Sequence, residues 1–144
     1  MKKLLLVNGP NLNLLGTREP EIYGTSTLSD VEELSVAAAA EQGWQMQAVH
    51  SNHEGVLIDA IHASRYECQG IVINPGGLTH TSVVLRDALT GVGLPFAEVH
   101  ISDVSAREEF RRFSYLADVA RVRVSGEGIA GYATAVRRLI ALIA

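Results

Sequence analysis

Short strand-like segments alternate with longer amphipathic segments along the chain. The pattern predicts buried β-strands over residues 3–8, 45–50, 70–74, 95–100 and 121–124. Apolar positions at helical spacing predict helices over residues 27–42, 54–64, 81–91, 105–112 and 129–143. Ser29 with Glu32, and Ser105 with Glu108, have the spacing of a capping box, and Gly43 has the position of a helix stop.

Strands that alternate with helices indicate a parallel sheet covered on both faces, because each parallel crossover must pass over one face. We therefore expect an α/β, flavodoxin-like three-layer sandwich with a five-stranded sheet in the order 2-1-3-4-5. The length of 144 residues, without an internal repeat or linker, predicts a single domain over residues 1–144. Such folds serve many functions, so the chemistry has to be inferred from particular residues.

Composition narrows the class of protein. The chain is 47% hydrophobic and 19% charged, which is typical of globular proteins, and no apolar run approaches the roughly 20 residues of a membrane span. The apolar run near Met1 is too short for a signal peptide, so we expect cytoplasmic residence. Cys68 is the only cysteine, which excludes an internal disulfide. The net charge of −4 argues against a nucleic-acid partner but leaves a small anionic ligand possible.

Polar residues gather after three of the predicted strands. In open α/β sheets, ligands bind beyond the carboxyl ends of the strands. About 18 residues separate the first strand from the next helix, where two to six are usual, and a long ordered loop is often a functional lid. Residues 74–81 follow the third strand, and residues 98–103 span the end of the fourth. We expect these segments to converge on one edge of the sheet.

The long first loop carries Tyr23, with Arg18 five residues earlier. A phenol has an ordinary pKa near 10, so it can act as a base near neutral pH only beside a cation that stabilises the phenolate. Arg18 could supply that charge. The alternative is an exposed tyrosine with a solvated arginine, and the spacing alone does not separate the two.

Gly76 and Gly77 precede a predicted helix, so their backbone can approach an anion closely. Asn74 could donate to a carboxylate or hydroxyl of the same ligand, and His80 could reach it from the helix start. The alternative is an ordinary glycine turn with His80 as a helix cap. Asp87 lies on the following helix, where a carboxylate is usually solvated.

Glu98 precedes His100 by two residues, so both side chains lie on one face of a strand. A carboxylate beside an imidazole orients it and suits it to general acid catalysis; a structural histidine at a strand end is the alternative. Arg107 and Arg111 share a helix face and could hold a substrate carboxylate, or they are surface residues. The remaining histidines do not match the spacing of a tetrahedral metal site, so no metal is expected.

Six segments together resemble type II 3-dehydroquinate dehydratases over essentially the whole chain. They are NGPNLN (8–13), REPEIYG (18–24), SNHEG (51–55), INPGGLTHTS (73–82), EVHIS (98–102) and AREEFR (106–111). The resemblance implies an anti elimination of water from 3-dehydroquinate through an enolate, giving 3-dehydroshikimate in the shikimate or quinate pathway. It implies no cofactor and no metal.

The resemblance also implies a role for each site residue. Tyr23, assisted by Arg18, removes the C2 proton, and Asn11 holds a water against the enolate oxygen. His100, oriented by Glu98, protonates the leaving C1 hydroxyl. The residues that it implies for substrate binding are Asn74, Gly76, Gly77, His80, Asp87, Ile101, Ser102 and Arg111. The family assembles trimers into a dodecamer, so a homo-oligomer is expected, with Asp87 entering the site of a neighbouring subunit.

One segment departs from the family pattern. After Ser102 the family usually has Asn, a variable residue and His, whereas this chain has Asp103, Val104 and Ser105. An added carboxylate near an anion pocket would weaken substrate binding, or Asp103 faces away and caps the next helix. Two other hypotheses therefore stay open beside an active enzyme: a catalytically weakened paralogue, and a flavodoxin-like module that only binds an anion.

Overall fold

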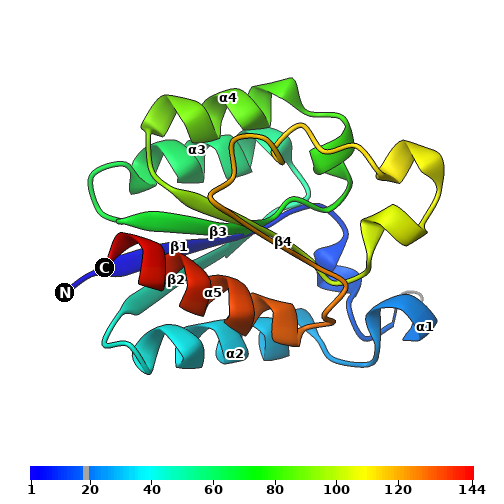
Figure 1. The fold of residues 1–144 in the computed structure, drawn as a ribbon, viewed down its shortest axis with the longest axis horizontal. Helices are drawn as coiled ribbons and strands as arrows, with labels where there is room; N and C mark the ends of the chain where they lie inside the picture. The colour runs from blue at the N-terminus through cyan, green and yellow to red at the C-terminus, as the bar shows by residue number, and fades with distance from the viewer. Residues whose placement is uncertain (18–19) are drawn as a thin grey trace.

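Five parallel strands form the centre of the molecule (Figure 1). The structure is a computed structural model that describes residues 1–17 and 20–144, without the side chains of residues 22 and 23. Arg18 and the Tyr23 side chain therefore lie outside the described residues. The strands are β1 (Lys3–Asn8), β2 (Gln45–His50), β3 (Gly70–Asn74), β4 (Phe96–His100) and β5 (Val122–Ser125). Their order, β2-β1-β3-β4-β5, confirms the predicted fold class.

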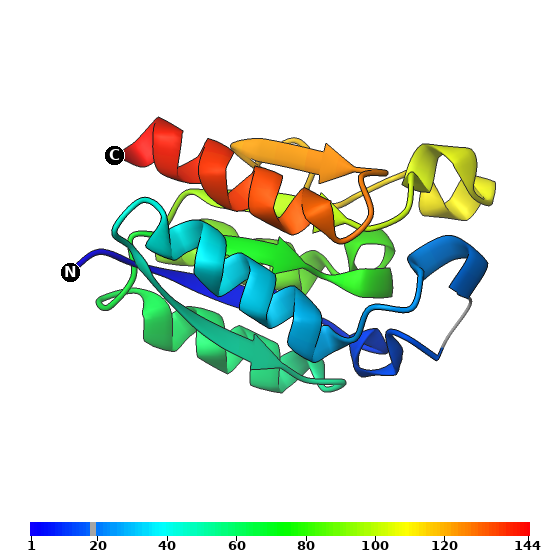
Figure 2. The same ribbon diagram turned by 90° about the horizontal axis from the view of Figure 1, so that it is seen from below.

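Two pairs of helices cover the two faces of the sheet. Helices α2 (Leu28–Ala40) and α5 (Ala130–Ile143) pack side by side on one face (Figure 2), and α3 (Glu54–Ser64) and α4 (Val83–Val92) pack together on the other. A short helix, α1 (Pro20–Tyr23), lies within the long loop after β1. Both chain termini lie at one end of the sheet, and the segments that follow β1 and β4 gather at the opposite, carboxyl end (Figure 1).

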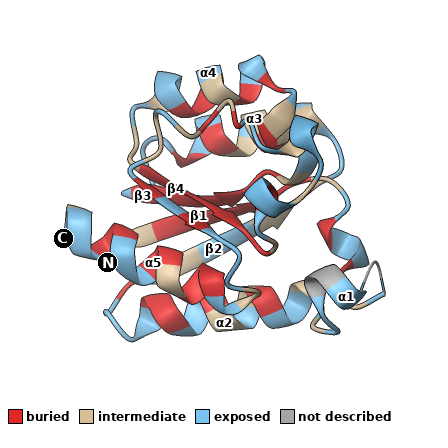
Figure 3. Ribbon diagram, turned by 45° about the vertical axis from the view of Figure 1, so that its right-hand side comes forward, coloured by how far each residue is buried: buried red, intermediate tan, exposed pale blue. Residues whose placement is uncertain are grey.

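The sheet separates two apolar cores, which account for the long hydrophobic runs in the sequence. Leu4 and Leu6 of β1 pack toward α2 and α5, whereas Leu5 and Val7 pack toward α3 and α4. Strands β1, β3 and β4 are therefore almost wholly buried (Figure 3). Strand β2 is an edge strand and exposes the polar residues Gln45 and Gln47, which explains why its sequence is less apolar.

The predicted capping box of α2 was wrong. Thr27, not Ser29, caps this helix: its side chain accepts from the Asp30 backbone N–H at 3.2 Å, and Asp30 Oδ2 accepts from the Thr27 N–H at 2.9 Å. The predicted helix over residues 81–91 also begins later, because Ser82 caps α4 by accepting from Leu85 N–H at 2.9 Å.

The helix predicted over residues 105–112 is not formed. The segment instead makes two 3₁₀ turns, η3 (Val104–Ala106) and η4 (Glu109–Arg111). Arg107 lies between them with an extended backbone, which breaks helical hydrogen bonding. The cap of η3 is Asp103, so the predicted pairing of Ser105 with Glu108 was wrong.

None of the helices in the described part of the chain is long and apolar enough to cross a membrane.

Candidate active site

A pocket of about 190 Å³ lies at the carboxyl ends of β1, β3 and β4. The three polar segments after these strands line it, as the topology of an open α/β sheet leads one to expect. Among the predicted site residues, those that line it are Asn11, Asn74, Gly76, Gly77, His80, His100, Ile101, Ser102 and Arg111. Residues far apart in the sequence are thus brought around one small volume.

Two glycines allow the loops after β1 and β3 to touch. A Cβ atom on Gly9 would lie 2.4 Å from the Pro75 carbonyl oxygen, and one on Gly76, which has φ of 59°, would lie 2.9 Å from the Pro10 oxygen. The Gly9 N–H also donates to the Asn74 carbonyl at 2.8 Å. Because neither contact leaves room for a side chain, the two loops can only meet with glycine at these positions.

Asn11 adopts a left-handed backbone conformation, with φ of 71°. Its backbone N–H donates to Asn52 Oδ1 at 2.8 Å, so the loop after β2 fixes the loop after β1. Asn52 lies in the SNHEG segment (51–55) that resembles the family, but the sequence alone did not indicate this role for it. A left-handed asparagine held in this way keeps its position at the pocket.

Asn74 is held by two hydrogen bonds. Its Nδ2 donates to the hydroxyl of Tyr132 at 2.8 Å, and its Oδ1 accepts from the Gly76 N–H at 3.1 Å. The Tyr132 hydroxyl in turn donates to Asn8 Oδ1 at 2.8 Å. One Nδ2 hydrogen of Asn74 is left for a ligand. Burial raises the pKa of Tyr132 far above its ordinary value despite the Asn74 hydrogen bond, so this phenol stays neutral.

His80 ends a 3₁₀ turn, η2 (Gly76–His80), and its Nδ1 lies 2.7 Å from the Phe113 carbonyl oxygen. Since a carbonyl only accepts, Nδ1 carries the hydrogen, and Nε2 of the neutral ring is an acceptor. Arg111 lies across the pocket and donates through Nε to Glu108 Oε2 at 2.6 Å. Its terminal nitrogens remain able to bind an oxygen of a ligand.

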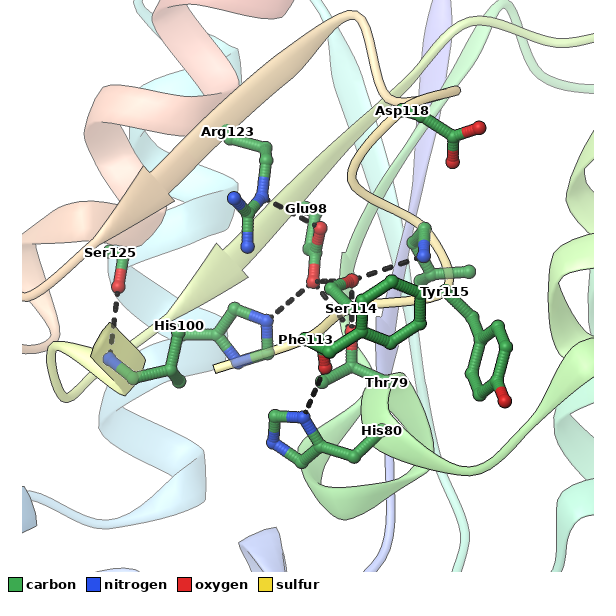
Figure 4. A network of polar contacts seen from close by, with 12 residues as sticks. Thr79, His80, Glu98, His100, Phe113, Ser114, Tyr115, Asp118, Arg123 and Ser125 are labelled. Atoms are coloured by element: carbon green, nitrogen blue, oxygen red, sulfur yellow. Dashed lines mark hydrogen bonds and ion pairs between the residues drawn. The ribbon is translucent and has the colours of Figure 1, made fainter. Parts of the chain in front are cut away.

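Glu98 and His100 form a buried pair at the end of β4 (Figure 4). His100 Nε2 lies 2.6 Å from Glu98 Oε2, and the same oxygen accepts from Thr79 Oγ1 at 2.6 Å and Ser114 Oγ at 2.8 Å. Arg123 Nε donates to the other oxygen, Oε1, at 3.0 Å. Because Nε2 of His100 faces Glu98, Nδ1 is the ring nitrogen that can exchange a proton with a ligand.

The environment of Glu98 keeps it ionised. Burial alone would raise its pKa, but hydrogen bonds from His100, Thr79 and Ser114, together with the charge of His100, lower that pKa to about 2. An ionised carboxylate at this position accepts the hydrogen bond from Nε2 and fixes the orientation of the ring. The arrangement is therefore suited to donating a proton into the pocket.

The segment after β4 is held by hydrogen bonds from the end of β5 and from the connection between β5 and α5. The Ile101 carbonyl accepts from the Gly128 N–H at 3.1 Å, and the Ser102 carbonyl accepts from Ser125 Oγ at 3.1 Å. Both contacts fix the backbone of residues that line the pocket.

Asp103, at which the sequence departs from the usual family pattern, does not line the pocket. It is exposed, and its Oδ1 accepts from the backbone N–H of Ser105 at 3.0 Å and from the Ser105 hydroxyl at 2.6 Å. These hydrogen bonds lower the pKa of Asp103, so its charge persists but is directed at the 3₁₀ turn. Of the two alternatives, the one in which Asp103 faces away and caps the next element fits this geometry.

Two predicted site residues of the described part of the chain do not line the pocket: Glu98, which lies behind His100, and Asp87. Asp87 is exposed on α4 and is not among the lining residues. Tyr23 contributes the last backbone position of α1, and Arg18 lies outside the described residues. Among residues 1–17 and 20–144, no cluster of three His, Cys, Asp or Glu side chains could hold a metal ion.

Fold and site together define a class of protein: an open α/β enzyme that moves protons on a small ligand. The features that define it are an imidazole held by an ionised carboxylate and a pocket with amide and guanidinium donors.

Comparison with known proteins identifies the family. A family model described as dehydroquinase class II matches residues 2–140. The catabolic 3-dehydroquinase 2 of Aspergillus flavus is 59% identical over 140 residues, which cover 97% of this chain and 93% of the relative. The catabolic 3-dehydroquinase of Pyricularia oryzae is 59% identical over 135 residues, covering 92% and 86%. The crystal structure of type II dehydroquinase from Butyrivibrio crossotus has a TM-score of 0.93 at 40% identity, covering 96% and 97%. The chain belongs to the class II dehydroquinase family, and it is a hydro-lyase.

Proposed function

We propose that the chain dehydrates 3-dehydroquinate to 3-dehydroshikimate, with Tyr23 as the base and His100 as the acid. The observation that carries the proposal is the buried Glu98–His100 pair at the edge of a pocket in a member of this family. An imidazole held by an ionised carboxylate suits the protonation of a leaving hydroxyl. A module that only binds an anion would not need this pair.

The first step is removal of a proton from C2 of the substrate. The proton moves to the Tyr23 phenolate, and the electron pair of the C–H bond forms an enolate with the neighbouring ketone. Arg18 lowers the free energy of forming the phenolate, and Asn11 holds a water against the enolate oxygen as a fixed dipole. The roles of these three residues rest on the family resemblance. The hydrogen bond from Asn11 to Asn52 supports a fixed position for Asn11.

In the second step the enolate collapses and the C1 hydroxyl leaves. Nδ1 of the His100 imidazolium gives its proton to that hydroxyl, so that water departs as the C1–C2 double bond forms. Nε2 remains on Glu98 throughout, which holds the ring in one orientation. After each turnover, His100 regains a proton and Tyr23 loses one, so no cofactor is consumed.

We assign substrate binding to hydrogen-bonding groups around the pocket. The substrate carboxylate lies on Asn74 and on the backbone N–H groups of Ile101 and Ser102, beside the close backbone of Gly76 and Gly77. His80 and Arg111 hold ring hydroxyls. The free Nδ2 hydrogen of Asn74 and the acceptor Nε2 of His80 are consistent with these roles.

An ultraviolet assay tests the proposed function. Wild type should produce the enone absorbance of 3-dehydroshikimate, and Tyr23→Phe and His100→Ala should lower kcat by two orders of magnitude or more, since general acid and base groups each contribute about 10² to 10⁴ in rate. Ligand affinity measured by calorimetry serves as the control for folding and binding. Equal turnover in all three proteins would overturn the mechanism, and an inactive wild type that binds the substrate would favour the binding module.

The same proposal includes assembly into a dodecamer, as a tetramer of trimers, with Asp87 completing the site of a neighbouring subunit. The exposed position of Asp87 on α4 is compatible with a role outside its own pocket. Light scattering should give a mass twelve times that of the 15.5 kDa chain. A monomer that retains full turnover would contradict the shared site.

The named relatives favour a catabolic role. Since the relatives from A. flavus and P. oryzae are called catabolic 3-dehydroquinases, we place this chain in quinate breakdown rather than aromatic amino acid synthesis. Deletion of the gene should abolish growth on quinate without creating a need for aromatic amino acids. The reverse result would assign a biosynthetic role. Cytoplasmic residence and a single domain over residues 1–144 stay predictions of the sequence.

A further inference from the structure

The two oxygens of Glu98 have different partners (Figure 4). Oε2 is bound by His100, Thr79 and Ser114, whereas Oε1 is bound by Arg123 alone among the residues for which hydrogen bonds are described. Arg123 lies directly opposite Glu98 in the β4–β5 register, so the two side chains project from adjacent positions of neighbouring strands. The pairing of β4 with β5 therefore places the Arg123 guanidinium beside the Glu98 carboxylate, which binds His100, the proposed acid.

We propose that Arg123 is a positioning residue for the dehydration, which acts through Glu98 to orient His100 and to set how readily His100 releases its proton. This inference rests on the proposed role of His100 as the general acid. Arg123 does not line the substrate pocket, so it acts without touching the substrate.

The first part of the role is geometric. A carboxylate can rotate about its terminal bond, and rotation of Glu98 would exchange the oxygen that His100 contacts. Arg123 Nε at 3.0 Å from Oε1, together with the hydroxyls on Oε2, leaves one rotation in which every donor is paired. The imidazole is thereby held at a fixed angle to the pocket.

The second part of the role is electrostatic. A lone Glu98 carboxylate would hold the His100 proton strongly, whereas a guanidinium on its far oxygen offsets part of that charge and makes the proton easier to transfer. Among the described residues, the other charged or titratable groups that line the pocket together with His100 are His80 on η2 and Arg107 and Arg111 after β4. They stay in place when Arg123 is replaced, so a change at Arg123 isolates its own contribution.

The arrangement also indicates that Arg123 can be replaced without unfolding the chain. Its side chain is 40% exposed and borders a hollow that Arg86 and Arg112 also line, so a polar replacement stays hydrated. Three donors on Oε2 still anchor Glu98 in the variant. Because Arg123 is partly exposed, solvent screens its charge and the expected electrostatic effect is moderate.

The test compares Arg123→Gln with wild type in the pH dependence of kcat/KM. The alkaline limb reports loss of the proton from the general acid, so it should move to higher pH by about half a unit when the guanidinium is removed. At neutral pH, kcat should fall by up to about 3-fold, because half a unit of tighter proton binding by His100 corresponds to a factor of about 3. Arg123→Lys should restore most of both changes.

Arg121→Gln is the matched control, since it removes the same charge two residues earlier, at the exposed position before β5. Its profile should superimpose on that of wild type. Arg123→Met, which keeps an apolar stem, takes the place of the glutamine variant if the latter does not fold. An unshifted alkaline limb in a folded variant without the guanidinium, or an equal shift in Arg121→Gln, would overturn the inference. If His100→Ala were fully active, the proposed role of His100 as the acid would fail, which is a separate result.

Discussion

The acid sensitivity of the fold should depend on one buried carboxylate. Glu98 is fully buried, and hydrogen bonds outweigh the effect of burial to lower its pKa from the ordinary 4.5 to about 2. Because folding lowers this pKa, the resulting stabilisation is complete above about pH 5 and is lost as the pH falls through 4.5 toward 2. The linkage corresponds to about 3 kcal/mol of unfolding free energy at neutral pH.

The perturbation that tests this is Glu98→Gln, which keeps the shape of the side chain and removes its titration. The amide presents a hydrogen-bond donor to groups that also donate, so the variant starts less stable by an amount that does not depend on the charge of residue 98. The gap in unfolding free energy between wild type and Glu98→Gln should therefore shrink by about 3 kcal/mol between pH 6 and pH 2.

Urea unfolding followed by circular dichroism, at one fixed protein concentration, measures the gap at each pH. Glu41→Gln is the control, because Glu41 forms an exposed ion pair with Arg137 at 3.2 Å. Exposed ion pairs contribute about 0 to 1 kcal/mol. The unfolding free energy of this variant should therefore fall with decreasing pH as it does in wild type. A gap between wild type and Glu98→Gln that stays constant from pH 6 to pH 2 would refute the reasoning.

Four further substitutions test local contacts of the fold, beside the pocket and away from it. Gly9→Ala places a Cβ atom 2.4 Å from the Pro75 oxygen and should lower the unfolding free energy by about 1 to 3 kcal/mol in urea titrations. Gly91→Ala, where the added atom meets nothing within 4 Å, should instead raise it by about 0.5 to 1 kcal/mol, and a similar loss in both would contradict the contact. Tyr132→Phe removes the partner of two buried polar atoms, Asn74 Nδ2 and Asn8 Oδ1. It should cost about 1 to 3 kcal/mol and raise KM for substrate; an unchanged KM would separate this tyrosine from the site. Thr27→Ala removes a helix cap and should cost about 1 kcal/mol in the same titration, whereas no change would mean that Asp30 alone stabilises the helix start.

Much of the fold could be predicted because its signals are local. The runs Lys3–Asn8 and Gly70–Asn74 are buried on both faces and are followed directly by Gly9 and Pro75, so their bounds were predicted as observed. The prediction of a helix over residues 105–112 was wrong because two residues compete to cap this segment. Ser105 with Glu108 has a good local pattern, but Asp103 captures the Ser105 N–H and Arg107 adopts an extended backbone.

The site was predictable where its partners are close in sequence. Glu98 and His100 are two residues apart on one strand, and their contact follows from the period of a β-strand. Arg123 could be assigned to Glu98 only once the register of β4 and β5 was known, and nothing in the intervening irregular segment specifies that register. Thr79 and Ser114 reach the same carboxylate from separate loops, so only the structure brings them together. The roles of Tyr23 and Arg18 stay predictions.

Proton exchange at C2 of 3-dehydroquinate tests most directly whether Tyr23 is the base and His100 the acid. In deuterated water, nuclear magnetic resonance can follow exchange of the C2 hydrogen separately from loss of water. His100→Ala should still exchange the C2 hydrogen while dehydration falls by two orders of magnitude or more, and Tyr23→Phe should lose both. If His100→Ala loses exchange as completely as Tyr23→Phe, or if Tyr23→Phe retains it, the assignment of base and acid is wrong.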